Sequence, residues 1–349
     1  MQGFICGNTQ LACKNRLFLP PMAREDSIDG QPSEKLIDYY RAMARKGFGL
    51  IILEHAYVTP AGKASPKQMG IDKHYNTDVL GRIADAIHEQ DCRAVMQISH
   101  AGCSTRADLP VTFAPSKLIA AEKPALGKMR PHHTTRALTV EQIQQLVQAF
   151  VDAAVRVASL GYDGVEIHSA HGYLLNQFYS PLINKRTDDY GGSLLNRLRI
   201  HLEVLDGVHA ALGDFPVLLR LGAQDYEAAG NTLQDACEAA CVLAPHLSAL
   251  DISGSFHYLS RHDWSDKRKH SQSAEKTVEQ PDNQARSANG FFSKTSHAIR
   301  QSLRLYGYDT PVLLAGGLRS KSEAEAAILQ GACDFAGIGR AALNPSFTL

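Results

Sequence analysis

Two histidines and a tyrosine lie within six residues of one another, directly after a short apolar run. The run is Gly164–Ile167, and His168, His171 and Tyr173 follow it. Two imidazole N–H groups can hold a carbonyl oxygen and stabilise the negative charge that builds up on it. A phenol, whose ordinary pKa is about 10, can give a proton to a strongly basic carbon. The three residues therefore predict reduction of a polarised carbon–carbon double bond, with Tyr173 as proton donor.

The same residues allow two other interpretations. The histidines can simply cap a strand, with Tyr173 packed beside them. Glu166 and His168 are two residues apart and share a strand face, so together with His171 they form a two-histidine, one-carboxylate set of metal ligands. A metal-dependent barrel hydrolase would use that set. Since nothing else in the chain resembles a metal-ligand cluster, we expect no metal.

Short apolar runs of strand length alternate with helical patterns along the whole chain. The runs are Leu17–Met22, Leu50–Leu53, Ala94–Ile98, Gly164–Ile167, Val217–Leu221, Ala249–Ile252, Pro311–Ala315 and Phe335–Ile338. The helical patterns are Ser33–Lys46, Thr77–Gln90, Val140–Leu160, Leu195–Leu212, Leu233–Leu243, Phe291–Tyr306 and Lys321–Gln330. Eight strands that alternate with helices predict an α/β protein, a single (β/α)8 TIM barrel. A doubly wound sheet is the alternative, but its glycine-rich first-strand fingerprint is absent.

Two connections are far longer than ordinary loops between a strand and a helix. Gly102–Leu138 follows the third strand and Gly254–Asn289 follows the sixth, and both are polar. Long loops of this kind predict insertions over the site. The second contains aromatic and histidine residues that either line a pocket or anchor a solvated lid, namely His257, Tyr258, His262 and Trp264. No linker or repeat interrupts the chain, so we expect one domain over residues 1–349.

Composition narrows the class of partner. The chain has 349 residues, 44% of them hydrophobic, with 36 Lys and Arg against 36 Asp and Glu. This balance gives no overall basic charge that would call for nucleic acid. No apolar run reaches transmembrane length and the N-terminus resembles no signal peptide, so we expect a cytoplasmic protein without a membrane partner. The seven cysteines contain no CxxC and are expected to be reduced thiols: Cys6, Cys13, Cys92, Cys103, Cys237, Cys241 and Cys333.

In a barrel, chemistry sits at the carboxyl ends of the strands. Arg220 lies inside the apolar run Val217–Leu221, where a cation is costly unless a negative partner meets it. It therefore predicts a buried anion or an electron-rich ligand edge at this position. The alternative is a structural ion pair with Asp163, Glu166 or Asp251.

The last two strands end in glycines. Ala315-Gly316-Gly317 ends the seventh, and Gly337-Ile338-Gly339-Arg340 ends the eighth. Glycines let backbone N–H groups approach an anion, and loops at this place in barrels often bind phosphate. Arg340 adds a forked positive charge. The sequence predicts a phosphate site here, which also suits a flavin-free phosphate-binding barrel such as an isomerase or aldolase.

The stretch HSAHGYLLNQF followed by NKRTDDYGGS, which begins at His168, resembles the signature of the Old Yellow Enzyme family of FMN-dependent NAD(P)H:flavin oxidoreductases, or ene-reductases. The resemblance covers most of the chain. It implies FMN as cofactor, NADH or NADPH as reductant and an enone-like small-molecule substrate held by His168 and His171. It further implies two alternating half-reactions. A flavin-binding or scaffold protein without catalysis is the remaining alternative.

The resemblance also implies the cofactor contacts. The segment that ends the first strand runs beside the flavin ring, and Gln97 bonds the pyrimidine edge of the ring. Arg220 lies at the N1 and O2 side of the flavin, and the glycines with Arg340 hold the phosphate. The implied cofactor-binding residues are Pro21, Met22, Ala23, Gln97, Arg220, Gly316, Gly317, Gly339 and Arg340.

Four departures from the family pattern stand out. Ala23 stands where relatives usually have Thr or Cys, whose side chain tunes the flavin. His55 stands where a small residue often lies against the flavin, and Cys103 replaces an Arg. The chain also reaches Leu349 soon after the eighth strand, so we expect either a missing final helix or cover from a neighbouring chain in a homo-oligomer.

Overall fold

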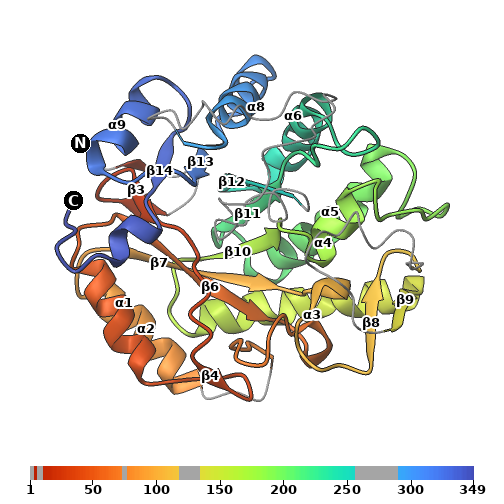
Figure 1. Ribbon diagram of the computed structural model, residues 1–349, viewed down its shortest axis with the longest axis horizontal. Helices are drawn as coiled ribbons and strands as arrows, with labels where there is room; N and C mark the ends of the chain where they lie inside the picture. The colour runs from red at the N-terminus through yellow and green to blue at the C-terminus, as the bar shows by residue number, and fades with distance from the viewer. Residues whose placement is uncertain (1–3, 6–10, 73–76, 118–133, 256–289) are drawn as a thin grey trace, which may run out of the picture.

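Eight parallel strands close into a barrel. The computed structural model describes residues 4–5, 11–72, 77–117, 134–255 and 290–349. Around the barrel the strands follow the order β3-β6-β7-β10-β11-β12-β13-β14, and β14 pairs with β3 to close it. Figure 1 shows helices around the outside of the ring of strands. The structure therefore confirms the predicted (β/α)8 fold.

The barrel strands coincide with the eight predicted runs. They are β3 (Leu17–Leu19), β6 (Leu50–Tyr57), β7 (Arg93–Ser99), β10 (Gly164–Ser169), β11 (Val217–Gly222), β12 (Ala249–Ser253), β13 (Val312–Ala315) and β14 (Phe335–Gly337). β3 ends earlier than predicted, because Pro20 and Pro21 have no backbone N–H to donate to a neighbouring strand. β6 continues four residues beyond the predicted Leu53.

The predicted helices are also present. They are α1 (Lys35–Ala44), α2 (Thr77–His88), α3 (Val140–Ser159), α5 (Leu194–Leu212), α6 (Leu233–Leu243), α8 (Ser293–Leu305) and α9 (Lys321–Leu329). Thr139 and Gln142 form a capping box that fixes the start of α3. The short helix α4 (Leu174–Tyr179) was not predicted. It begins directly after Tyr173 and so helps to place that residue.

Side chains alternate between two buried layers, as the pleat of each strand requires. Leu17, Leu19 and Ile51 point outward and pack with the helices, whereas Phe18 and Leu50 point into the barrel. The inner layer also contains Ile52, Val95, Leu218, Ala249, Leu313, Ala315 and Phe335, joined by Leu11 and Cys13. The barrel interior is therefore a packed core that leaves the ligand site to the strand ends.

Three small two-stranded sheets accompany the barrel. β1 (Phe4–Ile5) pairs with β2 (Ala12–Cys13), and β4 (Ser27–Ile28) pairs with β5 (Gln31–Pro32). Inside the long segment 102–138, β8 (Val111–Ala114) pairs with β9 (Thr134–Ala137). Residues 118–133 and 256–289 lie outside the described residues. His257, Tyr258, His262 and Trp264 fall there, so the roles predicted for them stay predictions.

After β14 the described chain contains the 3-10 helix η5 (Arg340–Leu343) and no α-helix. The segment that follows packs beside α1: the Phe347 and Phe48 ring centroids lie 6.3 Å apart, and the Leu349 N–H donates to the Lys46 carbonyl. Among the described cysteines, Cys13, Cys92, Cys103 and Cys333 are buried, Cys237 and Cys241 are half-buried, and all six are free. No helix in the described part of the chain has the length and apolar character to cross a membrane.

Candidate active site

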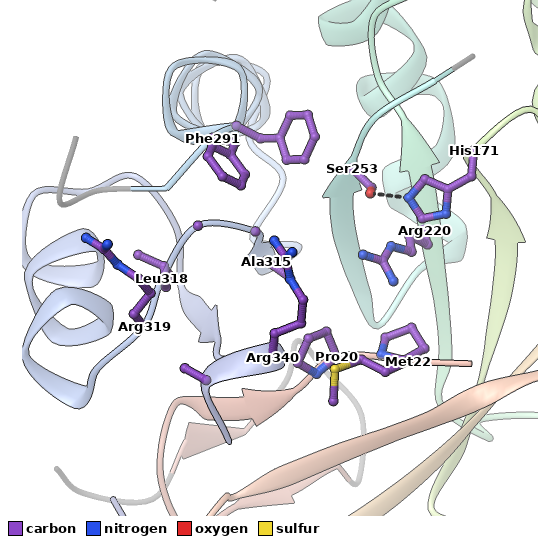
Figure 2. A pocket seen from close by; sticks show the side chains of 16 residues that line it. Pro20, Met22, His171, Arg220, Ser253, Phe291, Ala315, Leu318, Arg319 and Arg340 are labelled. Carbon is purple, nitrogen blue, oxygen red and sulfur yellow. Dashed lines mark hydrogen bonds between the residues drawn. The ribbon is translucent and has the colours of Figure 1, made fainter. Parts of the chain in front are cut away.

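A cavity of about 660 Å³ opens at the carboxyl ends of the strands. This volume lies in the range of small-molecule and cofactor sites. Its walls come from β11, from the ends of β12 and β13, from the segments that follow β3, β10, β13 and β14, and from the two residues before α8 (Figure 2). The lining residues are Pro20, Pro21, Met22, His171, Arg220, Ser253, Phe291, Phe292, Ala315, Gly316, Gly317, Leu318, Arg319, Gly339, Arg340 and Ala341.

His168, His171 and Tyr173 are brought together as the sequence predicts. The centroid of the His168 ring lies 5.1 Å from that of His171 and 5.0 Å from that of Tyr173. His171 has a φ of 59°, which is uncommon outside glycine, and the His171 N–H donates to the Gly254 carbonyl. This sharp turn aims the His171 ring into the cavity, while His168 and Tyr173 are not among the cavity-lining residues.

The two imidazoles are neutral near pH 7. Burial holds the pKa of His168 and that of His171 well below the ordinary value, and the positive charge of Arg220 adds to both effects. Burial also raises the pKa of Tyr173 to about 12, so the phenol keeps its proton. The cluster therefore offers imidazole N–H donors and one phenolic proton without a net charge of its own.

The neighbours of the two histidines differ. His171 Nε2 lies 2.8 Å from the Ser253 hydroxyl oxygen, a hydrogen bond drawn in Figure 2. When Ser253 donates in this bond, the proton of the neutral ring is on Nδ1. His168 Nδ1 is buried and has no hydrogen-bond partner among the described residues. A buried ring nitrogen without a partner is costly, which marks this ring as one that a ligand can complete.

Arg220 belongs to a cluster of buried charges inside the barrel. Strand register places it beside His168 on one side and Asp251 on the other. Arg220 Nε lies 3.2 Å from Asp251 Oδ2, within ion-pair distance but without hydrogen-bond geometry. The guanidinium also lines the cavity and extends toward its centre in Figure 2. The alternative of an ion pair with Asp251 is therefore present, and the same cation remains available to a ligand.

Gln97 and Glu166 complete this cluster. Gln97 Nε2 donates to Glu166 Oε1 at 2.6 Å, and Gln97 does not line the cavity. Burial, followed by the negative charge of Asp251, raises the pKa of Glu166 to about 8. Burial raises the pKa of Asp251 to about 6, although Arg220 opposes the change. The raised pKa favours the protonated form of Glu166, and Asp251 is the carboxyl group that lies within ion-pair distance of Arg220.

The part of the cavity that is predicted to bind phosphate consists of glycine backbone and the Arg340 side chain. Gly316 and Gly317 have φ angles of 112° and 88°, which side-chain-bearing residues rarely adopt. A Cβ on Gly339 would lie 3.3 Å from Met22 Sδ, so glycine keeps this wall close to β3. Arg340 extends into the cavity from η5 (Figure 2). Backbone and cation together suit an anionic group.

The structure adds cavity residues that the sequence reasoning missed. Ser253, Phe291 and Arg319 line the cavity, and Arg319 also reaches Glu323 at 3.2 Å. Ser253 is polar at the end of an apolar strand, which is a usable signal. For Phe291 the sequence contains no such signal, because this residue follows a long segment whose course the sequence does not define. Of the predicted cofactor contacts, Ala23 and Gln97 are absent from the cavity wall, and the others line it.

The sequence pattern of the NADH:flavin oxidoreductase / NADH oxidase family matches residues 3–349, and the chain therefore belongs to this family. An NADH oxidase of Thermoanaerobacter brockii is 33% identical over 334 residues, which cover 95% of this chain and 47% of that protein. An NADPH dehydrogenase of Halalkalibacterium halodurans is 39% identical over 224 residues, 64% of this chain and 63% of that protein. The chain thus spans less than two thirds of either relative.

Solved structures agree with the fold. Morphinone reductase in complex with tetrahydroNAD has a TM-score of 0.74 and 25% identity, and the match covers 97% of this chain and 86% of that one. A complex of 2-naphthoyl-CoA reductase has a TM-score of 0.80 and 24% identity, with 99% and 50% of the two chains covered, and supports the fold alone. The resemblance to the Old Yellow Enzyme family is confirmed, and with it FMN and NADH or NADPH as the cofactors of the family.

The cavity residues fit FMN. FMN joins a planar, electron-poor ring system to an anionic phosphate. The cavity offers apolar walls at Pro21 and Met22 and a cation at Arg220 for the ring system. The glycines and Arg340, which also line it, suit the phosphate. The metal alternative has no comparable support. Within the described residues, no group of three or more His, Cys, Asp and Glu side chains is arranged to hold a metal ion.

Proposed function

We propose that this protein takes electrons from NADH or NADPH and uses them, through bound FMN, to reduce the C=C bond of an α,β-unsaturated carbonyl compound. The two half-reactions would share one site in a ping-pong sequence. The observation that carries the proposal is the cluster of two neutral imidazoles and a protonated phenol at the edge of the cavity. Membership of the family supports the cofactors.

FMN, when bound, supplies a carrier that accepts a hydride from the nicotinamide and passes it to the substrate. In this proposal, Arg340 and the backbone at Gly316, Gly317 and Gly339 hold the phosphate. Pro21, Met22 and Ala23 would lie along the ring, and Gln97 would bind its polar edge. Arg220, whose guanidinium lines the cavity, would face the edge where negative charge grows on reduction and would stabilise that charge.

His168 and His171 would bind the carbonyl oxygen of the substrate. A neutral imidazole donates one hydrogen bond, so two rings supply two donors to one oxygen. As electrons enter the alkene, negative charge moves onto that oxygen and both hydrogen bonds strengthen. Ser253 fixes the tautomer of His171 when its hydroxyl donates to Nε2.

Tyr173 would deliver a proton to the α-carbon. Its pKa of about 12 keeps the phenol protonated at neutral pH, yet it remains a far stronger acid than the carbon it protonates. The positive charge of Arg106 opposes the rise of the Tyr173 pKa and the negative charge of Glu25 adds to it, and these two side chains form an ion pair with each other.

Tyr173→Phe tests this role, because it keeps the ring and removes the proton. We expect flavin reduction by NAD(P)H to be unchanged and re-oxidation by 2-cyclohexenone to slow by roughly 10²–10⁴-fold, the usual contribution of a general acid. Stopped-flow absorbance of the two half-reactions measures both rates. Equal re-oxidation by the variant and the wild type would contradict the assignment of Tyr173.

The flavin-free isomerase or aldolase and the metal-dependent hydrolase are not favoured, since the family is an oxidoreductase family. One FMN-binding domain over residues 1–349, a small-molecule substrate, a cytoplasmic location and a homo-oligomer stay predictions from the sequence.

A further inference from the structure

His55 is a fourth ring beside the three that the proposed function uses. It lies on β6, and the centroid of its ring is 5.4 Å from that of Tyr173 and 5.8 Å from that of His168. The sequence drew attention to His55 only as a large residue at a place where relatives often have a small one. Its surroundings show what this side chain offers.

Gln68 determines which nitrogen of His55 carries the proton. The Ala64 N–H donates to Gln68 Oε1 at 2.6 Å, so the other end of the amide, Nε2, is the donor. Gln68 Nε2 lies 2.7 Å from His55 Nδ1 and 3.0 Å from the His55 carbonyl oxygen. Ser99 Oγ also lies 3.0 Å from His55 Nδ1, and its hydroxyl can donate to that nitrogen. With Gln68 as donor, His55 Nδ1 accepts a hydrogen bond, and the neutral ring carries its proton on Nε2.

The His55 ring is neutral, and its N–H group has no hydrogen-bond partner among the described residues. Burial lowers the pKa of His55 to about 4, with further lowering from the positive charges of Arg106 and Arg220. Within the described residues Nε2 has no hydrogen-bond partner, and it is not among the fully buried unpartnered atoms. At neutral pH, His55 thus presents an uncharged N–H donor that no described part of the protein uses.

The chain that follows β3 runs beside the strand that carries His55. Leu19 pairs with Ile51, and the Arg24 N–H donates to Glu54 Oε2 at 2.8 Å, so the chain after β3 continues alongside β6. β6 has a register irregularity between Leu53 and Ala56, so His55 lies where the strand departs from regular pairing. Ala23, the residue before Arg24, has only a methyl group and offers no side-chain donor, whereas His55 on β6 does.

His55 is not itself among the cavity-lining residues, but it lies beside His168 and Tyr173. We propose, on the basis of the proposed function, that His55 is a ligand-binding residue whose Nε2–H donates a hydrogen bond to an uncharged acceptor bound beside this ring cluster. The acceptor is a carbonyl oxygen or ring nitrogen. Two molecules carry that chemistry here: the flavin ring, beside Pro21 and Met22, and the substrate, beside His168 and Tyr173. A donor at this place orients the ligand without adding charge.

The tautomer and the contact are visible in ¹⁵N-histidine NMR spectra, with His55→Phe used to assign the signal. The protein without ligand should show the Nε2–H tautomer of a neutral ring. A shift of the His55 signal on addition of FMN alone identifies the flavin as acceptor, and a shift only on further addition of 2-cyclohexenone identifies the substrate. A proton on Nδ1, or no response to either ligand, overturns the proposal. A sample whose absorbance shows no bound FMN contradicts the proposed function and this inference with it.

Three variants test the donor separately from the shape of the ring. His55→Phe keeps a ring without a donor, whereas His55→Gln keeps an N–H at similar reach. Gln68→Glu retains the acceptor for the Ala64 N–H but places an acceptor beside His55 Nδ1, which favours the Nδ1–H tautomer of the neutral ring. The ¹⁵N spectrum of this variant shows whether the ring has changed tautomer and stayed neutral. Loss of one neutral hydrogen bond should weaken binding of the identified ligand about three- to tenfold in His55→Phe and Gln68→Glu, and no more than about twofold in His55→Gln.

Fluorescence titration with FMN and absorbance titration of the FMN-loaded protein with 2-cyclohexenone measure the two affinities. Equal affinities in His55→Phe and wild type contradict the proposal. So does an equal loss in His55→Phe and His55→Gln, because that result would assign the effect to packing.

Discussion

Replacing Arg220 with methionine should lower the free energy of unfolding, because buried carboxyl groups would lose the positive charge beside them. Arg220 Nε lies 3.2 Å from Asp251 Oδ2, and both Asp251 and Glu166 are completely buried. Neither Asp251 oxygen has a hydrogen-bond partner among the described residues. Breaking a buried ion pair by removing one partner costs about 3–5 kcal/mol. We expect a loss of that size in the free energy of unfolding near pH 8.

The loss should depend on pH in a defined direction. Arg220 lowers the pKa of Asp251, which is about 6, and that of Glu166, which is about 8, so both pKa values rise further in Arg220→Met. A carboxyl group with a raised pKa in the folded protein gives its full stability below the pKa of the unfolded chain. It loses that stability as the pH rises through the folded pKa. The difference between wild type and Arg220→Met should therefore be small near pH 5 and grow toward pH 8.

Urea unfolding of the flavin-free protein, followed by circular dichroism at pH 5 and pH 8, measures this difference. The double variant Arg220→Met/Asp251→Asn is the matched control, because it removes both charges and should recover much of the stability lost at pH 8. An equal loss at both pH values, together with no recovery in the double variant, would refute the electrostatic account of this cluster.

Two other substitutions test neighbouring parts of the site. Gly317→Ala should lower the free energy of unfolding by about 1–2 kcal/mol because of the φ of 88° at this residue. The variant should also bind FMN more weakly in a titration, since its Cβ would lie 3.2 Å from the Phe291 nitrogen at the cavity wall. Gly161→Ala, with a φ of 83° and no atom within 4 Å, is the control for the backbone cost, and an equal FMN affinity in the two variants would contradict the cavity role. Glu166→Gln removes a group whose pKa is about 8 in the folded protein, so its stability relative to wild type should rise by a few kcal/mol from pH 5 to pH 8, one pKa unit being about 1.4 kcal/mol. Parallel urea curves at the two pH values would show no such rise.

The barrel could be predicted because its strands are short apolar runs that alternate with amphipathic helices. The sequence pattern did not predict the length of β6 or the presence of α4, because contacts with distant parts of the chain determine both. β6 extends to Tyr57 although Glu54 and His55 interrupt its apolar run, since Arg24 and Gln68 satisfy these polar groups from elsewhere in the chain. All six residues of α4 are buried, so no polar face marks it as a helix.

The closeness of three candidate site residues was predictable for a related reason. His168, His171 and Tyr173 lie close together in sequence, so one loop brings them to one place. The residues that contact buried site residues lie far apart from them in the sequence. Ser253 is 82 residues from His171, and Gln97 is 69 residues from Glu166, so only the closed barrel and its strand register reveal these contacts. The donor on His55 likewise depends on how Gln68 is held.

The most direct test of the proposed function is a sequential-mixing experiment on the FMN-loaded protein without oxygen. NADH or NADPH is mixed first, and 2-cyclohexenone is added after the nicotinamide has been consumed, while the flavin absorption band is followed. The proposed function predicts that the nicotinamide alone bleaches the band and that the enone then restores it with formation of cyclohexanone. A band that the nicotinamide cannot bleach, or that the enone cannot restore, would contradict it.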